Sequence, residues 1–298
     1  MVNKWSPVAQ SVEQMTVNHW VGGSSPSRGA NFKVQYKMNY TLALKDITNS
    51  VKKWRIWYNL ALFDIKAKYQ RTKLGPIWIV LVNLVFVAGI SLVWSTIQQT
   101  DVRAVLPRFF AGFITWQFMA SFVLEGCEIY STEKKLISNI PMEKFLFQLK
   151  NAAVQLNIYL HNILGFYLVM TLFGKWPNFY SLLLIPSLIL TLLCGMAVSL
   201  ILSFFVARFR DLSPLIKSLM SVGMLVTPVL WDASQFGAKY YLVYLNPFAI
   251  FLDLVRKPLL GHPLGLLEVC LALAVTTIIS LCAFFLFARF RHRIIYWL

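Results

Sequence analysis

Few side chains in this sequence have the type and spacing for acid–base or metal chemistry. Glu125 and Glu128 lie one helical turn apart, a spacing at which two carboxylates in a cleft could exchange a proton. Lys134 and Lys135 follow closely, so we expect these carboxylates to form ion pairs with nearby basic residues. The four histidines are scattered along the chain, and neither HExxH nor GxSxG occurs. The sequence therefore predicts no catalytic residue and no metal ligand.

Nucleotide binding by this chain is also not expected. No GxxxxGK[ST] segment, whose backbone would hold nucleotide phosphates, occurs in the sequence. We therefore expect no bound cofactor, and any ATP and Mg²⁺ would bind to a partner subunit. The cysteines lie in or beside apolar runs without CxxC spacing, and we expect them to be buried thiols: Cys127, Cys194, Cys270 and Cys282.

Amide side chains within one apolar stretch are a more informative feature. The stretch at residues 152–173, with a helical extension back to residue 145, carries Asn151, Gln155 and Asn162 on one helical face. Unpaired amides facing lipid are costly. We favour hydrogen bonds from this face to other helices. The alternative is that the face lines a path for a polar substrate.

Aromatic side chains form a second stripe, in the preceding apolar stretch. Phe109, Phe113 and Trp116 follow one another at i, i+4 and i+7 on a helix. Aromatic faces pack against the C–H faces of sugar rings, so the stripe could line a channel for a sugar polymer. The interpretation we favour is an aromatic belt at the membrane boundary.

The elements that position these residues are predicted to be membrane-spanning helices. The chain has 298 residues, of which 58% are hydrophobic and 13% charged, with a net charge of +16. Soluble domains contain about 25% charged residues, so the apolar excess requires lipid. About 20 mostly apolar residues are needed to cross a bilayer. Six stretches meet this length, which predicts an all-α integral membrane protein with six transmembrane helices: residues 76–97, 109–130, 152–173, 179–207, 212–231 and 264–288.

The positions of the basic residues predict the orientation of these helices. Most lysines and arginines flank the apolar stretches on alternate sides, in the pattern of membrane topology and not of nucleic-acid binding. By the positive-inside rule both termini are expected in the cytoplasm, with the protein a multi-pass membrane component. No nucleic acid is expected as a partner.

The region before the first span divides in two. Residues 1–37 are polar and predicted to be a disordered extension; residues 7–30 resemble the conceptual translation of a tRNA gene, which would make Met38 the true start. Residues 38–75 are predicted to be a cytoplasmic segment and an amphipathic helix in the membrane interface. The residues expected to hold this helix at the interface are Trp54, Trp57, Tyr58, Lys68 and Arg71.

The region before the last span is not a simple loop. Residues 241–255 are apolar but too short to cross the bilayer, and the Asn246-Pro247 pair interrupts them. Short re-entrant helices, which enter and leave the membrane on one face, would satisfy the backbone at that depth.

Four motifs, in order along the chain, resemble those of one family. The sequences are DIKAKYQRTKLGPIW at residues 64–78, ARFRDLSPLIK at 207–217, TPVLW at 227–231 and YLNPF at 244–248. They are similar to segments of the ABC-2 type permeases that export polysaccharide. The LGPxW sequence is more similar to that of O-antigen permeases than to that of capsule or teichoic-acid permeases.

This resemblance implies a function and a set of partners. Residues 76–298 would form the transmembrane domain of a homodimeric permease that binds two cytoplasmic ATPase subunits and exports an undecaprenyl-linked polysaccharide. The loop at residues 131–141 would dock on the ATPase as a coupling helix through Leu136, Ile137 and Ile140; an ordinary solvated loop is the alternative. Trp231, Tyr244, Asn246 and Pro247 would form an outer gate. Alternative functions are a membrane scaffold without a transport path, or an ABC-2 permease for a small hydrophobic drug.

Overall fold

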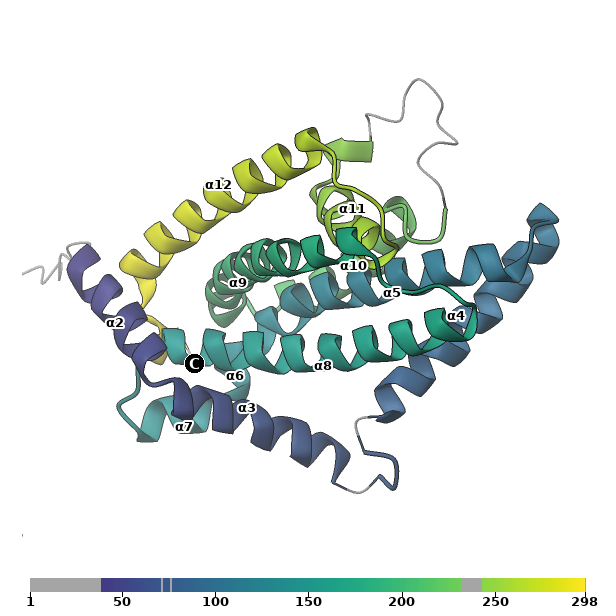
Figure 1. Ribbon diagram of the computed structural model, residues 1–298. Coiled ribbons are helices and arrows are strands. Elements are labelled where there is room, and N and C mark those ends of the chain that lie inside the picture. Colours follow the sequence, from purple (N-terminus) through teal and green to yellow (C-terminus); the bar gives the residue numbers. More distant parts are fainter. Residues whose placement is uncertain (1–38, 71, 76, 232–242, 298) are drawn as a thin grey trace, which may run out of the picture. The chain divides into compact units, whose positions relative to one another are not determined.

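The computed structural model describes residues 39–70, 72–75, 77–231 and 243–297, and the regular elements of these ranges are all helical (Figure 1). The all-α prediction is confirmed. Contacts divide the chain into Met1–Lys37 and Met38–Leu298, and the described residues belong to the second unit. The predicted disorder of residues 1–37 therefore lies outside the described residues.

Five helical segments are long and apolar enough to cross a membrane, which gives the described chain the composition of a multi-pass membrane protein. Their principal helices are α4 (Ile77–Gln98), α5 (Val102–Leu124), α8 (Phe145–Leu172), α9 (Leu184–Arg208) and α12 (Leu266–Phe290). The first, third, fourth and last predicted spans match α4, α8, α9 and α12 closely. The 3-10 turn η2 (Phe179–Leu183) precedes α9.

A sixth span is not confirmed. The stretch predicted to span at residues 212–231 contains α10 (Leu212–Val226), which has 15 residues. At 1.5 Å per residue this helix is about 22 Å long, whereas the hydrocarbon layer is about 30 Å thick. The helix ends because Thr227 is extended and Pro228, which has no backbone N–H, follows it.

The second span begins earlier than predicted. Asp101 caps α5 by accepting the backbone N–H of Arg103 at 2.8 Å, so Arg103 and Pro107, which precede the predicted start at residue 109, lie inside the helix. After α5 the chain turns through η1 (Gly126–Glu128), α6 (Ile129–Thr132) and α7 (Lys134–Asn139). The predicted end of this span at residue 130 therefore lies in η1 and α6, whereas α7 lies in the predicted coupling segment at residues 131–141.

The segment before α4 forms two helices, α2 (Tyr40–Lys52) and α3 (Trp54–Tyr69), which meet at Lys53. The side chains of Trp54 and Tyr58 are exposed, whereas Trp57 is partly buried. Lys68 is exposed near the end of α3. Arg71 lies outside the described residues.

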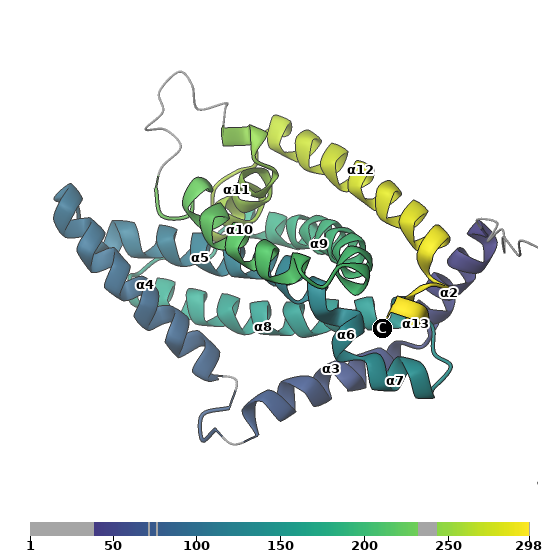
Figure 2. The same cartoon turned by 180° about the vertical axis from the view of Figure 1, so that it is seen from behind.

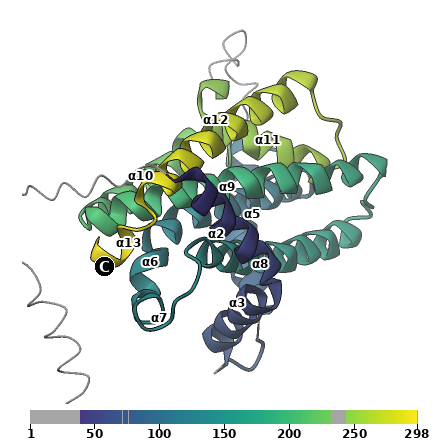
Figure 3. The ribbon, with the colours of Figure 1, turned by 90° about the vertical axis from the view of Figure 1, so that its left-hand side faces the viewer.

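Asp46 of α2 fixes the start of α8 from another helix. Its carboxylate accepts the backbone N–H groups of Phe145 at 3.2 Å and Lys144 at 3.4 Å, and the Arg291 guanidinium donates to it at 3.2 Å. Burial raises the pKa of Asp46, and these N–H groups and Arg291 oppose that rise. Figure 3 shows α2 crossing the end of α8.

The core surrounds α5, which packs against α4, α8, α9, α10 and α11. In its apolar window 78% of residues are buried inside the chain, against 17% for α4 and for α12. Figure 2 shows α10 alongside α5 and α9 from the opposite side. The flanking helices α4 and α12 therefore present most of their side chains outward.

Near the C-terminus, Asn246 and Pro247 start a helix. Asn246 caps α11 (Pro247–Leu259) by accepting the backbone N–H of Phe248 at 3.0 Å, and Pro247 occupies the first turn. The predicted pair of re-entrant helices is not confirmed, and residues 232–242 lie outside the described part. The chain ends in α12 and α13 (Ile294–Trp297). On α12, Cys270 and Cys282 are exposed, which corrects the expectation of buried thiols, while Cys127 and Cys194 are buried.

Candidate functional site

A groove of about 390 Å³ runs between α5 and α8, and Met224 of α10 contributes to its lining. It brings together four residues predicted from the sequence to line a path: Phe113, Trp116, Gln155 and Asn162. Further polar groups come from α5 and from the end of α3, namely Gln117, Ser121, Glu125 and Lys68. The groove is therefore mixed in character, with amides and aromatic rings on adjoining walls.

Asn162 connects three helices through a chain of amides. Asn83 of α4 donates its Nδ2–H to Asn162 Oδ1 at 2.9 Å, and Gln117 of α5 donates its Nε2–H to Asn83 Oδ1 at 3.1 Å. Asn83 and Asn162 are buried. Hydrogen bonding between helices, the interpretation favoured from the sequence, is therefore confirmed for Asn162. Asn83 was missed, although an amide in the middle of an apolar span is itself a signal of a polar partner.

The aromatic stripe divides between two environments. Phe109 is buried against Trp94, with ring centroids 6.1 Å apart, and lies outside the groove. Phe113 packs on Phe86 at 4.7 Å and Trp116 on Phe248 at 5.3 Å, and both rings line the groove. All three side chains of the stripe are buried inside the chain. The favoured interpretation of a lipid-facing belt is therefore wrong, because belt residues lie against lipid headgroups.

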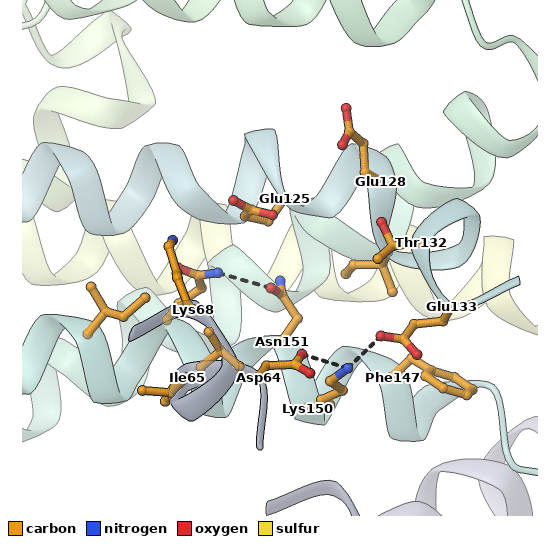
Figure 4. Close-up of a pocket in the computed structure, with 14 residues that line it drawn as sticks. Asp64, Ile65, Lys68, Glu125, Glu128, Thr132, Glu133, Phe147, Lys150 and Asn151 are labelled. Atoms are coloured by element: carbon orange, nitrogen blue, oxygen red, sulfur yellow. Dashed lines mark hydrogen bonds and ion pairs between the residues drawn. The ribbon is translucent and has the colours of Figure 1, made fainter. Parts of the chain in front are cut away.

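A second cavity of about 200 Å³ adjoins the groove, since Lys68, Glu125, Gln155 and Ile158 line both (Figure 4). Asn151 lines this second cavity and accepts a hydrogen bond from Gln155 Nε2 at 3.1 Å. The Nδ2 of Asn151 is buried and has no hydrogen-bond partner among the described residues. Asn151 therefore offers a donor at this end of the groove, where charged side chains from α3, α5 and α8 converge.

Several of the charges around the second cavity are paired between different segments. Lys150 of α8 lies 2.6 Å from Asp64 Oδ2 and 2.5 Å from Glu133 Oε1 (Figure 4). Glu128 pairs with Lys217 of α10 at 2.5 Å and accepts a hydrogen bond from Ser213. The ion pairing expected for Glu128 is thus present, but its partner lies 89 residues along the chain and not in the adjacent lysines.

The predicted coupling residues lie in and after α7 with different exposures. Ile137 is 3% exposed and belongs to a buried cluster that includes Tyr130 and Phe147, and Leu136 packs partly against the same cluster. Ile140 is 46% exposed. The expectation that all three residues form a free apolar ridge is corrected, because Ile137 is covered by the chain's own side chains. Of the three, Ile140 has its side chain most available to a partner.

The predicted gate residues lie beside a buried charge network. Asn246 Nδ2 donates to Thr227 Oγ1 at 2.9 Å, and the Tyr244 hydroxyl donates to Glu268 at 3.2 Å. Trp231 Nε1 donates to the carbonyl of Leu225 at 2.9 Å. Pro247 begins α11, and residues of that helix and of α12 supply the network: Asp253, Arg256, Lys257 and Glu268.

Arg256 connects α11 to the end of α10. Its Nη2 lies 2.5 Å from Asp253 Oδ1 and its Nη1 donates to the carbonyl of Pro228 at 2.7 Å. Both members of this ion pair are buried. The sequence contained a signal for the pair, because opposite charges three residues apart in an apolar helix are expected to meet.

No group of three or more histidine, cysteine or acidic residues suitable for a metal ion occurs among the described residues. The arrangement offers hydrogen bonds, aromatic faces and paired charges along one groove. Such groups can hold and pass a hydroxyl-rich molecule without altering its covalent bonds.

The sequence is similar to those of two known export permeases. No family model matches the chain. It is 23% identical over 226 residues to the O-antigen export system permease protein RfbA of Myxococcus xanthus, which covers 74% of this chain and 86% of the relative. It is 20% identical over 188 residues to the protein of the same name from Klebsiella pneumoniae, covering 62% of this chain and 73% of the relative. These similarities confirm the resemblance to polysaccharide export permeases that the four sequence motifs predict.

Proposed function

We propose that this chain is the membrane-spanning permease subunit of an ABC transporter that exports O-antigen polysaccharide. The observation that carries the proposal is the groove between α5 and α8, in a chain similar to two O-antigen export permeases. The chain is a transport subunit and not an enzyme. ATP and Mg²⁺ bind to a separate cytoplasmic ATPase, present in two copies.

The groove suits a glycan because of the groups on its walls. The amides of Gln117 and Gln155 can exchange hydrogen bonds with sugar hydroxyls, and the ring of Trp116 can pack against sugar C–H groups. Such contacts do not require one register, so a long polymer can slide along them. A small hydrophobic drug, the alternative substrate, would be better served by an apolar lining.

A second copy of the chain completes the route. Polar side chains at membrane depth are costly against lipid, and Gln117 and Gln155 line the groove. Two copies that face each other across their grooves would shield these groups and enclose one path. The undecaprenyl carrier of the glycan remains in the surrounding lipid.

The orientation follows from the basic residues. The end of α3 and the segment at α7 carry Lys66, Lys68, Lys134 and Lys135, and by the positive-inside rule these lysines support a cytoplasmic position for this side of a bacterial inner membrane protein, with both termini there. The second cavity is then the cytoplasmic mouth of the groove, and Trp231, Tyr244, Asn246 and Pro247 lie at its outer gate. Leu136 and Ile140 contact the ATPase.

The test is complementation of a host strain from which this gene is deleted. O-antigen should disappear from the cell surface, accumulate on its lipid carrier inside the cell, and return when the chain is supplied. Gln117→Leu with Gln155→Leu should lower surface O-antigen, while the outward-facing Leu164→Ala has little effect. Normal surface O-antigen in the deletion strain would contradict the proposal and favour the alternative of a membrane scaffold.

A further inference from the structure

Lys150 of α8, Asp64 and Glu133 form a triad of charged side chains that joins three segments of the chain. The Lys150 ammonium group contacts Asp64 of α3 at 2.6 Å and Glu133, the residue that precedes α7, at 2.5 Å. Figure 4 shows the ammonium group between the two carboxylates, at the edge of the second cavity. Lys150 lies on α8, two residues after Gln148 and one before Asn151.

The burial of Lys150 distinguishes this triad from an ordinary surface ion pair. Its side chain is 8% exposed, and that of Glu133 is 17% exposed. The ion pair of Lys53 with Glu143 joins the segment before α8 to the junction of α2 and α3. The side chain of its lysine is 44% exposed. Exposed pairs contribute little because water competes for both charges, whereas a buried lysine depends on its carboxylates.

The triad connects a cytoplasmic segment to the wall of the groove. Glu133 is the N-cap residue of α7, so its position moves with that helix. Lys150 is followed on α8 by Asn151 and Gln155, which line the cytoplasmic mouth. Glu128, five residues before Glu133, is paired with Lys217 of α10. A displacement of residues 126–139 would therefore act on α8 through one ion pair and on α10 through the other.

We propose that Lys150 is a positioning residue that transmits movement of the cytoplasmic segment at residues 126–139 to α3 and α8, and so sets the width of the groove. This inference rests on the proposed function, because the movement would be driven by the ATPase subunit. Two short charge-assisted contacts on one ammonium group resist separation of the three segments. Without these contacts, a movement of α7 would not displace α8, which forms one wall of the groove.

Glu133→Ala tests this link without leaving a charge unpaired, because Lys150 keeps its contact with Asp64. Glu143→Ala is the matched control, since it removes a carboxylate of similar exposure from a pair that does not reach the groove. In the complemented deletion strain, Glu133→Ala should lower surface O-antigen tenfold or more, and Glu143→Ala less than twofold. The co-purified complex with Glu133→Ala should still contain the ATPase and hydrolyse ATP within twofold of the wild-type rate.

A triple variant without the three charges distinguishes transmission of movement from the mere balance of buried charge. Asp64→Asn, Glu133→Gln and Lys150→Met together leave no buried charge, and export should remain low, whereas Lys150→Arg should retain it. Restored export by the triple variant would overturn the inference, as would normal export by Glu133→Ala. Loss of the ATPase or of the folded chain in Glu133→Ala would also overturn it, since the role would then be structural. If the wild-type chain restores no surface O-antigen, the proposed function itself fails before any variant is compared.

Discussion

Gly126 follows the end of α5, at the start of the segment at residues 126–139, and it packs directly on α9. A Cβ at this position would lie 2.8 Å from both Cα and Oγ of Ser199. Carbon atoms are in favourable contact at about 3.5–4.0 Å, so Gly126→Ala requires about 0.7–1.2 Å of additional separation. Rotation of the Ser199 side chain cannot relieve the contact with Cα, which is part of the backbone.

The expected cost of Gly126→Ala has two parts. Displacement of the backbone in a packed interior costs about 1–3 kcal/mol. Movement of Ser199 Oγ also breaks its hydrogen bond to Gln148 Oε1, which is 2.9 Å long and buried, at about 0.5–1.5 kcal/mol. The sum is a loss of about 1.5–4.5 kcal/mol in the free energy of unfolding.

Thermal unfolding of the purified protein in detergent, followed by tryptophan fluorescence, measures this loss. At about 2 °C per kcal/mol, the melting temperature should fall by about 3–9 °C. Gly89→Ala is the matched control, because Gly89 lies in the helix α4 and nothing lies within 4 Å of its added Cβ. It should leave the melting temperature unchanged or raise it slightly, since alanine favours the helix. Equal melting temperatures for the two variants would refute the reasoning.

Three further predictions use the same thermal assay. Arg256→Met should destabilise the protein by about 3–5 kcal/mol because the carboxylate of Asp253 remains buried without its partner, and adding Asp253→Leu should recover most of the loss; no recovery would show that the pair is not the cause. Asn162→Leu should cost about 0.6–1.7 kcal/mol by removing the hydrogen bond to α4, and an unchanged melting temperature would contradict that bond. Ile137→Asp should prevent stable folding, whereas Ile140→Asp should leave the melting temperature unchanged and reduce co-purification of the ATPase; the opposite pattern would reverse their assigned exposures.

The sequence was sufficient for features that depend on one helix at a time. The lengths of the apolar stretches located α4, α8, α9 and α12 because the bilayer imposes a minimum length on a span. The helical spacing of Gln155 and Asn162 placed both on one face, and the structure finds both in the groove. The end of α10 was missed, since its apolar residues continue past the point where Thr227 becomes extended.

Contacts between residues on different helices could not be predicted from the sequence. Asn83 and Asn162 are 79 residues apart, and nothing in the local sequence of either identifies the other as its partner. Glu128 was expected to pair with neighbouring lysines, but the turn at η1 carries it toward Lys217. The burial of Ile137 could likewise not be predicted from the sequence, because a short amphipathic segment can pack its apolar side against its own chain or against another protein.

The contact of Asp46 with the first residues of α8 and with Arg291 has a consequence for biogenesis. Asp46 is synthesised first, the start of α8 about 100 residues later, and Arg291 245 residues after Asp46. During translation the carboxylate can cap α8 as soon as that helix is made, but its guanidinium partner arrives after the last span has entered the membrane. A chain interrupted before Arg291 would leave this acidic group buried without its cation, and such incomplete chains should be recognised and degraded more readily than the finished protein.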